Sequence, residues 1–219
     1  MARSSARPAP EPPRPAPRLY VLAPAAADPA GSAAQVAALR AAAAEADIAA
    51  VLLRAAAGAG APALAPLIEA CQAIGAAGLV EGASAEATAL GADGVHVEGT
   101  AALKAAAAAR RPDGIVGAGG LRSRHDAMTA AEAGADYVMF GEPDAEGRRP
   151  PFETTLERTQ WWAELFEPPC VGYARTLEEV EALVAAGADF IAVDTLVFDA
   201  PGDGARALAA RLVLPGAAS

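Results

Sequence analysis

A short pattern recurs three times in this chain and limits how the chain can fold. Residues 90–98 read Leu-Gly-Ala-Asp-Gly-Val-His-Val-Glu, residues 133–141 read Ala-Gly-Ala-Asp-Tyr-Val-Met-Phe-Gly, and residues 186–194 read Ala-Gly-Ala-Asp-Phe-Ile-Ala-Val-Asp. In each copy an Ala-rich stretch of helical period ends at a Gly suited to a helix C-terminus, and an apolar run follows. Each copy therefore predicts a helix that leads directly into a strand, which is half of a βαβ unit.

Apolar runs of strand type are spread along the whole chain, at 18–23, 48–53, 78–81, 94–97, 114–118, 137–140, 169–173 and 190–193. Helical segments follow them, at 32–47, 66–74, 84–90, 101–110, 123–133, around 161–162, at 176–186 and at 204–212. Eight strands that alternate with helices favour a closed (β/α)8 TIM barrel with parallel strands. A Rossmann-type sheet is the alternative, but residues 23–28 lack the Gly-rich turn that it needs after its first strand.

The length of 219 residues suits one α/β domain. Residues 1–17 are rich in Pro and Arg and predict a disordered tail, so the barrel is expected over 18–219. The tail lacks the apolar segment of a secretory signal, and no later run is long enough to span a membrane. Cys71 and Cys170 have no metal-binding or redox spacing. We therefore expect a cytoplasmic protein with two buried thiols.

The net charge of the chain limits the kinds of molecule that it can bind. The formal net charge is −10, and no basic stripe offsets it. Such a chain repels nucleic acid and anionic membrane surfaces, so we expect neither as a partner. A small molecule or another protein fits better, and the sequence leaves open whether the chain forms a homo-oligomer.

Two helix starts have the signature of a capping box. Ser32 with Gln35, and Ser123 with Asp126, place an N-cap hydroxyl three residues before a side chain that can reach back. Trp161 and Trp162 are adjacent and cannot share one helix face, so we expect one to pack on the barrel and the other to be exposed or to cover a partner surface.

The order of several segments resembles the thiamine phosphate synthase family. The segments are Arg18-Leu-Tyr-Val, Val51-Leu-Leu-Arg54, Gly91-Ala-Asp-Gly-Val-His-Val97, Ile115-Val-Gly117 and Gly134-Ala-Asp-Tyr-Val-Met-Phe-Gly141. The resemblance covers most of 18–213 and implies a (β/α)8 barrel of thiamine biosynthesis. Members of that family join a pyrimidine diphosphate to a thiazole phosphate with Mg²⁺, so the resemblance also implies a transferase with a magnesium site.

Many of the positions where that family has working residues differ in this chain. Leu52 and Ala56 replace a Gln and a Lys around Arg54, Gly119 replaces a Ser, and a Thr and a Lys are missing from 142–151. Gly82 and Ala101 stand where the resemblance implies the magnesium carboxylates. Ala174-Arg175-Thr176 replaces a Gly-Gly-Ile phosphate turn. No cofactor or metal ligand is therefore predicted, although Mg²⁺ belongs to the family, and the active site is interpreted as degenerate.

Polar side chains still gather at the expected C-terminal ends of the strands, which is where barrels of this type bind ligands. We predict substrate or phosphate contacts from Arg54, Glu81, Glu98, Arg122 and Arg175, and a catalytic role for His96. Glu142, Tyr173 and Asp194 are expected at the same mouth, with Arg124 and His125 close to it. A structural, hydrogen-bonded role for His96 is the alternative.

Three functional hypotheses follow. The first is a divergent thiamine phosphate synthase homologue that keeps the barrel and a small phosphorylated ligand. The second is a metal-independent isomerase, like the thiazole tautomerases that the sequence also resembles, with His96 as proton carrier. The third is a non-catalytic binding or regulatory protein on the same barrel, because a fold does not fix a function. The sequence does not decide the substrate.

Overall fold

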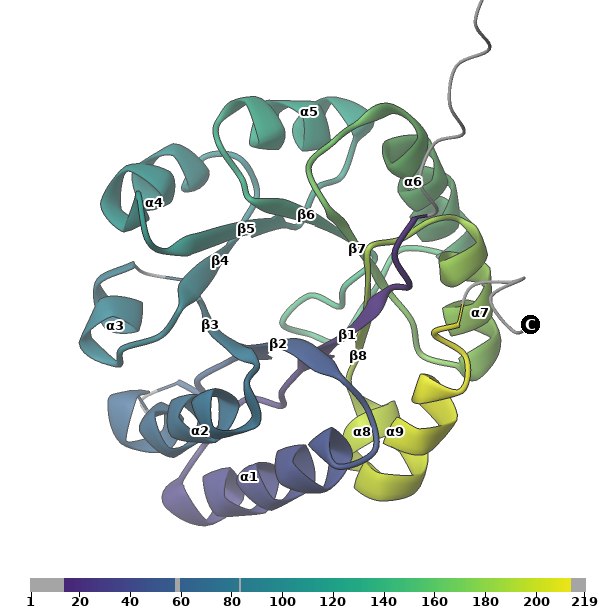
Figure 1. Cartoon of the computed structure of the whole chain (residues 1–219). Coiled ribbons are helices and arrows are strands. Elements are labelled where there is room, and N and C mark those ends of the chain that lie inside the picture. The colour runs from purple at the N-terminus through teal and green to yellow at the C-terminus, as the bar shows by residue number, and fades with distance from the viewer. Residues whose placement is uncertain (1–13, 58–59, 83, 214–219) are drawn as a thin grey trace, which may run out of the picture.

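The apolar runs form parallel strands that close into a barrel, as Figure 1 shows along the barrel axis. The computed structural model describes residues 14–57, 60–82 and 84–213, and it is these residues that the structure places. Among them, eight strands pair in sequence order, and β1 closes on β8. The strands are β1 (Arg18–Leu22), β2 (Ile48–Leu53), β3 (Ala77–Glu81), β4 (Gly94–Glu98), β5 (Ile115–Gly119), β6 (Tyr137–Phe140), β7 (Cys170–Tyr173) and β8 (Phe190–Val193). The predicted single-domain (β/α)8 TIM barrel is confirmed.

Helices surround the barrel and cover its outer surface (Figure 1). They are α1 (Pro29–Ala43), α2 (Gly60–Ile74), α3 (Ser84–Ala89), α4 (Leu103–Arg110), α5 (Arg124–Glu132), α6 (Phe152–Leu165), α7 (Leu177–Ala185), α8 (Thr195–Phe198) and α9 (Pro201–Ala209). The Ala-rich sequence suits this ring, because small side chains let helices pack closely on a sheet. The short helix α8 was not expected from the sequence. It fills the connection between β8 and α9.

The core has two layers, which follow from the alternation of side chains along each strand. In β1, Leu19 and Val21 point outward into the large apolar layer between the barrel and the helices. Tyr20 and Leu22 point inward, where the barrel interior is filled. The inward layer contains two further tyrosines, Tyr137 and Tyr173. These hydroxyl groups make the interior partly polar.

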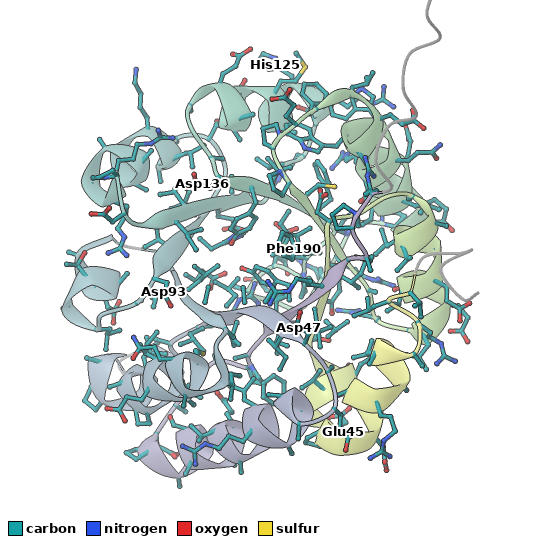
Figure 2. The ribbon with its side chains drawn as sticks, viewed as in Figure 1. Glu45, Asp47, Asp93, His125, Asp136 and Phe190 are labelled. Carbon is teal, nitrogen blue, oxygen red and sulfur yellow. The ribbon has the colours of Figure 1, made fainter. Side chains whose placement is uncertain are left out.

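The recurring Asp of the Gly-Ala-Asp pattern ties adjacent strands together at the N-terminal end of the barrel. Asp93 Oδ2 accepts from the N–H of Gly78 at 2.8 Å, and its own N–H donates to Gly78 O at 2.9 Å. Asp189 exchanges the same two bonds with Cys170. Figure 2 shows two residues of the pattern, Asp93 and Asp136, at this end of the barrel together with Asp47, which is not part of the pattern. Each of the three lies just before an even-numbered strand. The recurrence is therefore a structural device.

The predicted start of α1 at Ser32 is wrong. Asp28 is the N-cap, and its carboxylate accepts from the N–H of Gly31 at 2.8 Å. Pro29 follows at the first helical position, where its missing N–H costs nothing. Ser32 lies within the helix, and its hydroxyl donates to Ala63 O on α2 at 2.7 Å. Gln35 donates to Pro24 O instead of closing a capping box.

The predicted start of α2 is also wrong. The helix begins at Gly60, so Pro66 lies inside it. Burial of Ala63, Leu64 and Leu67 in the outer layer stabilises the added turn. The capping box at Ser123 and Asp126 is confirmed.

Other expectations have simple outcomes. Cys71 and Cys170 are free and buried, as predicted. Trp162 is fully buried, which confirms that one of the two rings packs on the barrel, whereas Trp161 is partly buried against the outer apolar layer rather than exposed. No helix among the described residues is long and apolar enough to cross a membrane. Residues 1–13 of the predicted tail lie outside the described residues, and Arg14 donates to Gly187 O and Ala163 O.

Candidate functional site

Two adjoining hollows open at the C-terminal ends of the strands. One has a volume of about 330 Å³ and lies beyond β5 and β6. The other has a volume of about 550 Å³ and lies beyond β1, β2 and β8. Glu98, at the end of β4, and Asp144 line both hollows. Every residue predicted to contact substrate or phosphate lies in one of these walls, because strand C-terminal ends meet on one face of a barrel.

The larger hollow, which we name the acidic hollow, is lined by more carboxylates than cations. Its charged residues are Arg54, Glu81, Glu98, Asp144, Arg175, Asp194 and Asp199. Arg54 pairs with Glu81, with 3.1 Å between Nε and Oε1, in a geometry that makes an ion pair without a hydrogen bond. The other carboxylates outnumber the remaining cation. The acidic hollow is therefore a poor site for an anion.

Arg175 is occupied by neighbouring groups. Its Nε donates to the Tyr173 hydroxyl at 3.2 Å, and its Nη2 donates to Gly147 O at 2.9 Å. The Tyr173 hydroxyl donates in turn to Asp194 Oδ2 at 2.8 Å, and burial raises the pKa of Tyr173 to about 12. Arg175 therefore serves first to fix the wall of the acidic hollow.

The smaller hollow, which we name the arginine pocket, has the opposite balance. Its charged residues are Glu98, Arg122, Glu142, Asp144, Arg148, Arg149 and Arg158. Arg148 pairs with Asp144 and Glu146, and Arg158 donates to the carbonyl oxygens of Leu121 and Arg122. The Arg122 side chain is exposed, and no polar partner for its guanidinium occurs among the described residues. Arg122 is thus available to an anion.

A half-buried ion pair fixes the loop between β6 and α6, which carries much of the arginine pocket. Both terminal nitrogens of Arg149 donate to the carboxylate of Glu179 on α7, at 2.8 and 2.6 Å. The two side chains are 18% and 14% exposed, so the pair is shielded from water. Bidentate geometry of this kind is specific and strong. The loop is therefore attached firmly to the barrel.

Glu142 is the titratable group in the pocket wall whose surroundings are most unusual. It follows β6, is half-buried, and accepts a short hydrogen bond from the N–H of Gly120. Burial raises the pKa of Glu142 to about 7, and the nearby carboxylate of Glu98 adds to the rise. Arg54 and the Gly120 N–H act in the opposite direction. A carboxyl group that titrates near neutral pH can both take and give a proton.

His96 lies beneath the mouth and lines neither hollow. It is 3% exposed, and its Nδ1 is 2.8 Å from the hydroxyl of Tyr137, whose own partner is the hydroxyl of Tyr20 at 2.8 Å. Burial, aided by the charge of Arg54, lowers the pKa of His96 to about 3. The imidazole is therefore neutral at pH 7. The sequence predicted a catalytic role for His96, and that role stays a prediction.

Gly119 leaves the space in which His96 and Glu142 approach each other. A Cβ added there would overlap both Glu142 Oε1 and His96 Nε2. The two polar atoms therefore face one small space at the end of β5. Sequence reasoning placed both residues near the mouth, but it could not show that this glycine brings them together.

Arg124 and His125 do not reach the mouth. Arg124 pairs with Glu157 at 2.7 Å and lies over the ring of Trp161. His125 is exposed on the outer side of α5 (Figure 2). Sequence reasoning missed Arg148, Arg149 and Arg158 as pocket residues. The dense charge of residues 142–151 was the available signal.

Comparison with known proteins places the chain in a family. The sequence profile described as "Thiamine monophosphate synthase" matches residues 19–197. The thiamine-phosphate synthase of Rhodospirillum centenum is 38% identical over 195 residues, which cover 88% of this chain and 94% of that protein. The thiamine-phosphate synthase of Erythrobacter litoralis is 38% identical over 138 residues, covering 61% and 65%.

Solved structures show the same fold. The thiamine phosphate pyrophosphorylase from Pyrococcus furiosus superposes with a TM-score of 0.70 at 22% identity, covering 89% of this chain and 95% of that one. A 3-hexulose-6-phosphate synthase superposes with a TM-score of 0.65 at 18% identity, covering 90% and 100%. At such identities the likeness shows the barrel alone. The family profile and the 38% identical relative carry the assignment, and the chain belongs to the thiamine monophosphate synthase family.

Proposed function

We propose that this chain is a divergent thiamine phosphate synthase-like barrel, in or derived from thiamine biosynthesis, and that it binds a small phosphorylated molecule in the arginine pocket. The observation that carries the proposal is the charge of that pocket, where four arginines face three carboxyl groups. Arg122 offers a guanidinium with no polar partner among the described residues, and guanidinium binds phosphate through paired N–H groups. Glu142, with a pKa near 7, is uncharged for part of the time at neutral pH.

The residues at the mouth do not fit a magnesium ion of the kind that the family resemblance implies. Gly82 and Ala101 carry no carboxylate at the two implied ligand positions. Glu81 is paired with Arg54, so its carboxylate is already neutralised. Mg²⁺ needs oxygen ligands in near-octahedral arrangement, usually including one or two carboxylates. The proposed function therefore involves no magnesium-dependent step.

The acidic hollow suits the remainder of the ligand rather than its phosphate. Arg54 and Arg175 are each engaged by neighbouring groups, and several carboxylates line the wall. A neutral or cationic ring would be favoured there over a second anion. Since Glu98 and Asp144 line both hollows, one molecule can extend from one hollow into the other.

Calorimetric titration with inorganic phosphate and with pyrophosphate, in the presence of a chelator, tests the anion site. Arg122→Gln should weaken binding at least about tenfold, because a charge-assisted pair contributes roughly 1.5–3 kcal/mol. Arg40→Gln is the matched control, since Arg40 is exposed in the last turn of α1 and lines neither hollow. Equal binding by the two variants, or no binding by the native protein, would contradict the proposal.

A second candidate function is metal-independent proton transfer on the bound molecule, as in the thiazole tautomerases. The pKa of Glu142 near 7, at the wall of the arginine pocket, favours it. Deuterium exchange into a thiazole phosphate, followed by NMR without metal, provides the test. Exchange that disappears in Glu142→Gln supports an isomerase. Binding without exchange supports a non-catalytic binding protein instead.

A further inference from the structure

A line of hydrogen-bonding groups runs through the barrel interior toward the arginine pocket. The hydroxyls of Tyr20 and Tyr137 are 2.8 Å apart, and the Tyr137 hydroxyl is 2.8 Å from Nδ1 of His96. All three side chains are at most 6% exposed. Buried polar groups of this kind are stable only when each finds a partner. Each group along the line therefore has a defined role as donor or acceptor.

The Tyr20 hydroxyl sets the direction of the line. Tyr137 is the hydrogen-bond partner of that hydroxyl among the described residues, so the Tyr20 proton goes to the Tyr137 oxygen. The Tyr137 hydroxyl then gives its own proton to Nδ1 of His96. Because the imidazole is neutral, its single proton is placed on Nε2. This Nε2–H faces the space beside Gly119.

The Glu142 carboxyl reaches the same space from the pocket side. A Cβ at Gly119 would overlap Glu142 Oε1 and His96 Nε2 alike, so the two atoms converge on one point. Glu142 lines the arginine pocket, whereas His96 is 3% exposed and lines neither hollow. A ligand can thus touch Glu142 but is separated from His96.

We infer that Glu142 is the catalytic acid–base residue of the arginine pocket and that His96, oriented by Tyr137, is a positioning residue that directs its Nε2–H at the carboxylate. This inference rests on the second candidate function. The Glu142 carboxylate removes a proton from a C–H or N–H bond of the ligand, and the bonding electrons stay on the ligand. The resulting carboxylic acid returns the proton to another ligand atom, so the step needs no metal and no co-reactant.

Other charges around Glu142 affect its protonation and must be counted. Arg54 faces it from the end of β2 and favours the carboxylate, whereas Glu98 from β4 disfavours it. The N–H of Gly120 donates to the carboxylate from the loop after β5. Among the cations of the arginine pocket, Arg122 and Arg148 are exposed and screened by solvent. Arg149 and Arg158 are half-buried and are engaged by Glu179 and by carbonyl oxygens. His96 and the two tyrosines occupy the barrel side.

Carbon-detected NMR titration of the side-chain carboxyls tests the inference on the full chain without any ligand. Glu142→Gln identifies the resonance. We expect the native carboxyl to titrate near pH 7. In His96→Met the Nε2–H beside Glu142 Oε1 is lost, and the Glu142 pKa should rise, because a nearby N–H dipole favours the carboxylate. In His96→Gln an amide N–H replaces the Nε2–H, so the pKa should stay within about 0.3 unit of the native value.

Tyr137→Phe gives an independent measurement that leaves the packing almost unchanged. Without the Tyr137 hydroxyl, Nδ1 has no donor and the imidazole is free to turn its lone pair toward Glu142. The Glu142 pKa should then rise, as in His96→Met. The rate of deuterium exchange into the thiazole phosphate should fall at least tenfold in Glu142→Gln. The rate in His96→Gln should be higher than that in His96→Met.

Two results would overturn the inference. One is a native Glu142 that titrates near 4.5, and the other is a Glu142 pKa that is the same in His96→Met, Tyr137→Phe and the native protein. Neither result depends on phosphate binding, which the Arg122→Gln titration measures separately. Failure of the inference and failure of the proposed function are therefore distinguishable.

Discussion

Asp136 and Val116 exchange two hydrogen bonds at the N-terminal end of the barrel. The N–H of Asp136 donates to Val116 O at 2.8 Å, and the N–H of Val116 donates to Asp136 Oδ2 at 2.8 Å. The same exchange joins Asp93 to Gly78 and Asp189 to Cys170. In each pair the Asp carboxylate accepts from the N–H of the first or second residue of an odd-numbered strand. It thus takes the place of a backbone acceptor on a neighbouring strand. The most conspicuous pattern in the sequence is thus explained by the fold and not by catalysis.

Asp136→Ala should lower the free energy of unfolding by about 1–3 kcal/mol, because the Val116 N–H loses its acceptor in a partly buried site. Asp136→Asn keeps an acceptor oxygen and should cost less. Asp113→Ala, at an exposed turn, is the matched control and should stay within about 0.5 kcal/mol of the native protein. Urea denaturation measures all three. Equal losses for Asp136→Ala and Asp113→Ala would remove the structural role of the pattern.

Gly119→Ser should disturb the mouth of the barrel. The new Cβ overlaps Glu142 Oε1 and His96 Nε2, and the imidazole is held in the packed interior. The Glu142 carboxyl must therefore move away and lose its bond from Gly120, at a cost of about 1–3 kcal/mol. Gly202→Ala is the control, since a Cβ on α9 meets nothing and should stabilise by up to about 1 kcal/mol. Thermal unfolding that moves both variants in the same direction would contradict this account.

Glu142→Gln should become more stable than the native protein as the pH rises. The folded-state pKa of Glu142 is raised to about 7 from an ordinary value of 4.5. Between these values the folded state binds more protons than the unfolded state, so native stability falls with increasing pH. The variant lacks this loss, and its advantage should grow by about 1–2 kcal/mol from pH 4.5 to pH 8, less than for a fully buried carboxylate. Urea denaturation across this range checks the slope, and a constant difference would count against a raised pKa.

His96 should contribute the opposite slope in acid. Its pKa is lowered to about 3 from 6.5, so the unfolded state binds the additional proton between these values. Native stability is therefore lost as the pH falls from 6.5 toward 3. His96→Gln does not titrate and should lose less stability over the same interval. If the two proteins lose stability in parallel, His96 is not buried as a neutral imidazole.

The barrel could be predicted from the sequence because helix ends and strand starts are local features. Each Gly-Ala-Asp copy specifies a helix terminus and a strand within a few residues. Element boundaries depend on competing signals that lie close together in the sequence. Ser32 has the sequence context of an N-cap, yet Asp28 caps α1 because Pro29 starts the helix and Ser32 finds its acceptor on α2.

The site could be predicted in position but not in detail. The strand-end rule brought Arg54, Glu81, Glu98, Arg122 and Arg175 to the mouth. The partners of these residues are set by tertiary packing, which the sequence does not show. Neighbouring groups engage the guanidinium groups of Arg54 and Arg175, whereas the Arg122 guanidinium has no polar partner among the described residues. The sequence places Glu142 at the mouth but does not show its partial burial, which raises its pKa to about 7.

We propose that this barrel binds phosphate at its mouth and does not perform magnesium-dependent diphosphate chemistry. Incubation of the protein with the pyrimidine diphosphate, the thiazole phosphate and Mg²⁺, with thiamine phosphate measured by chromatography, tests it most directly. We predict no thiamine phosphate above the rate without protein, while phosphate binding to the same preparation persists without metal. Robust formation of thiamine phosphate that requires Mg²⁺ would contradict the account.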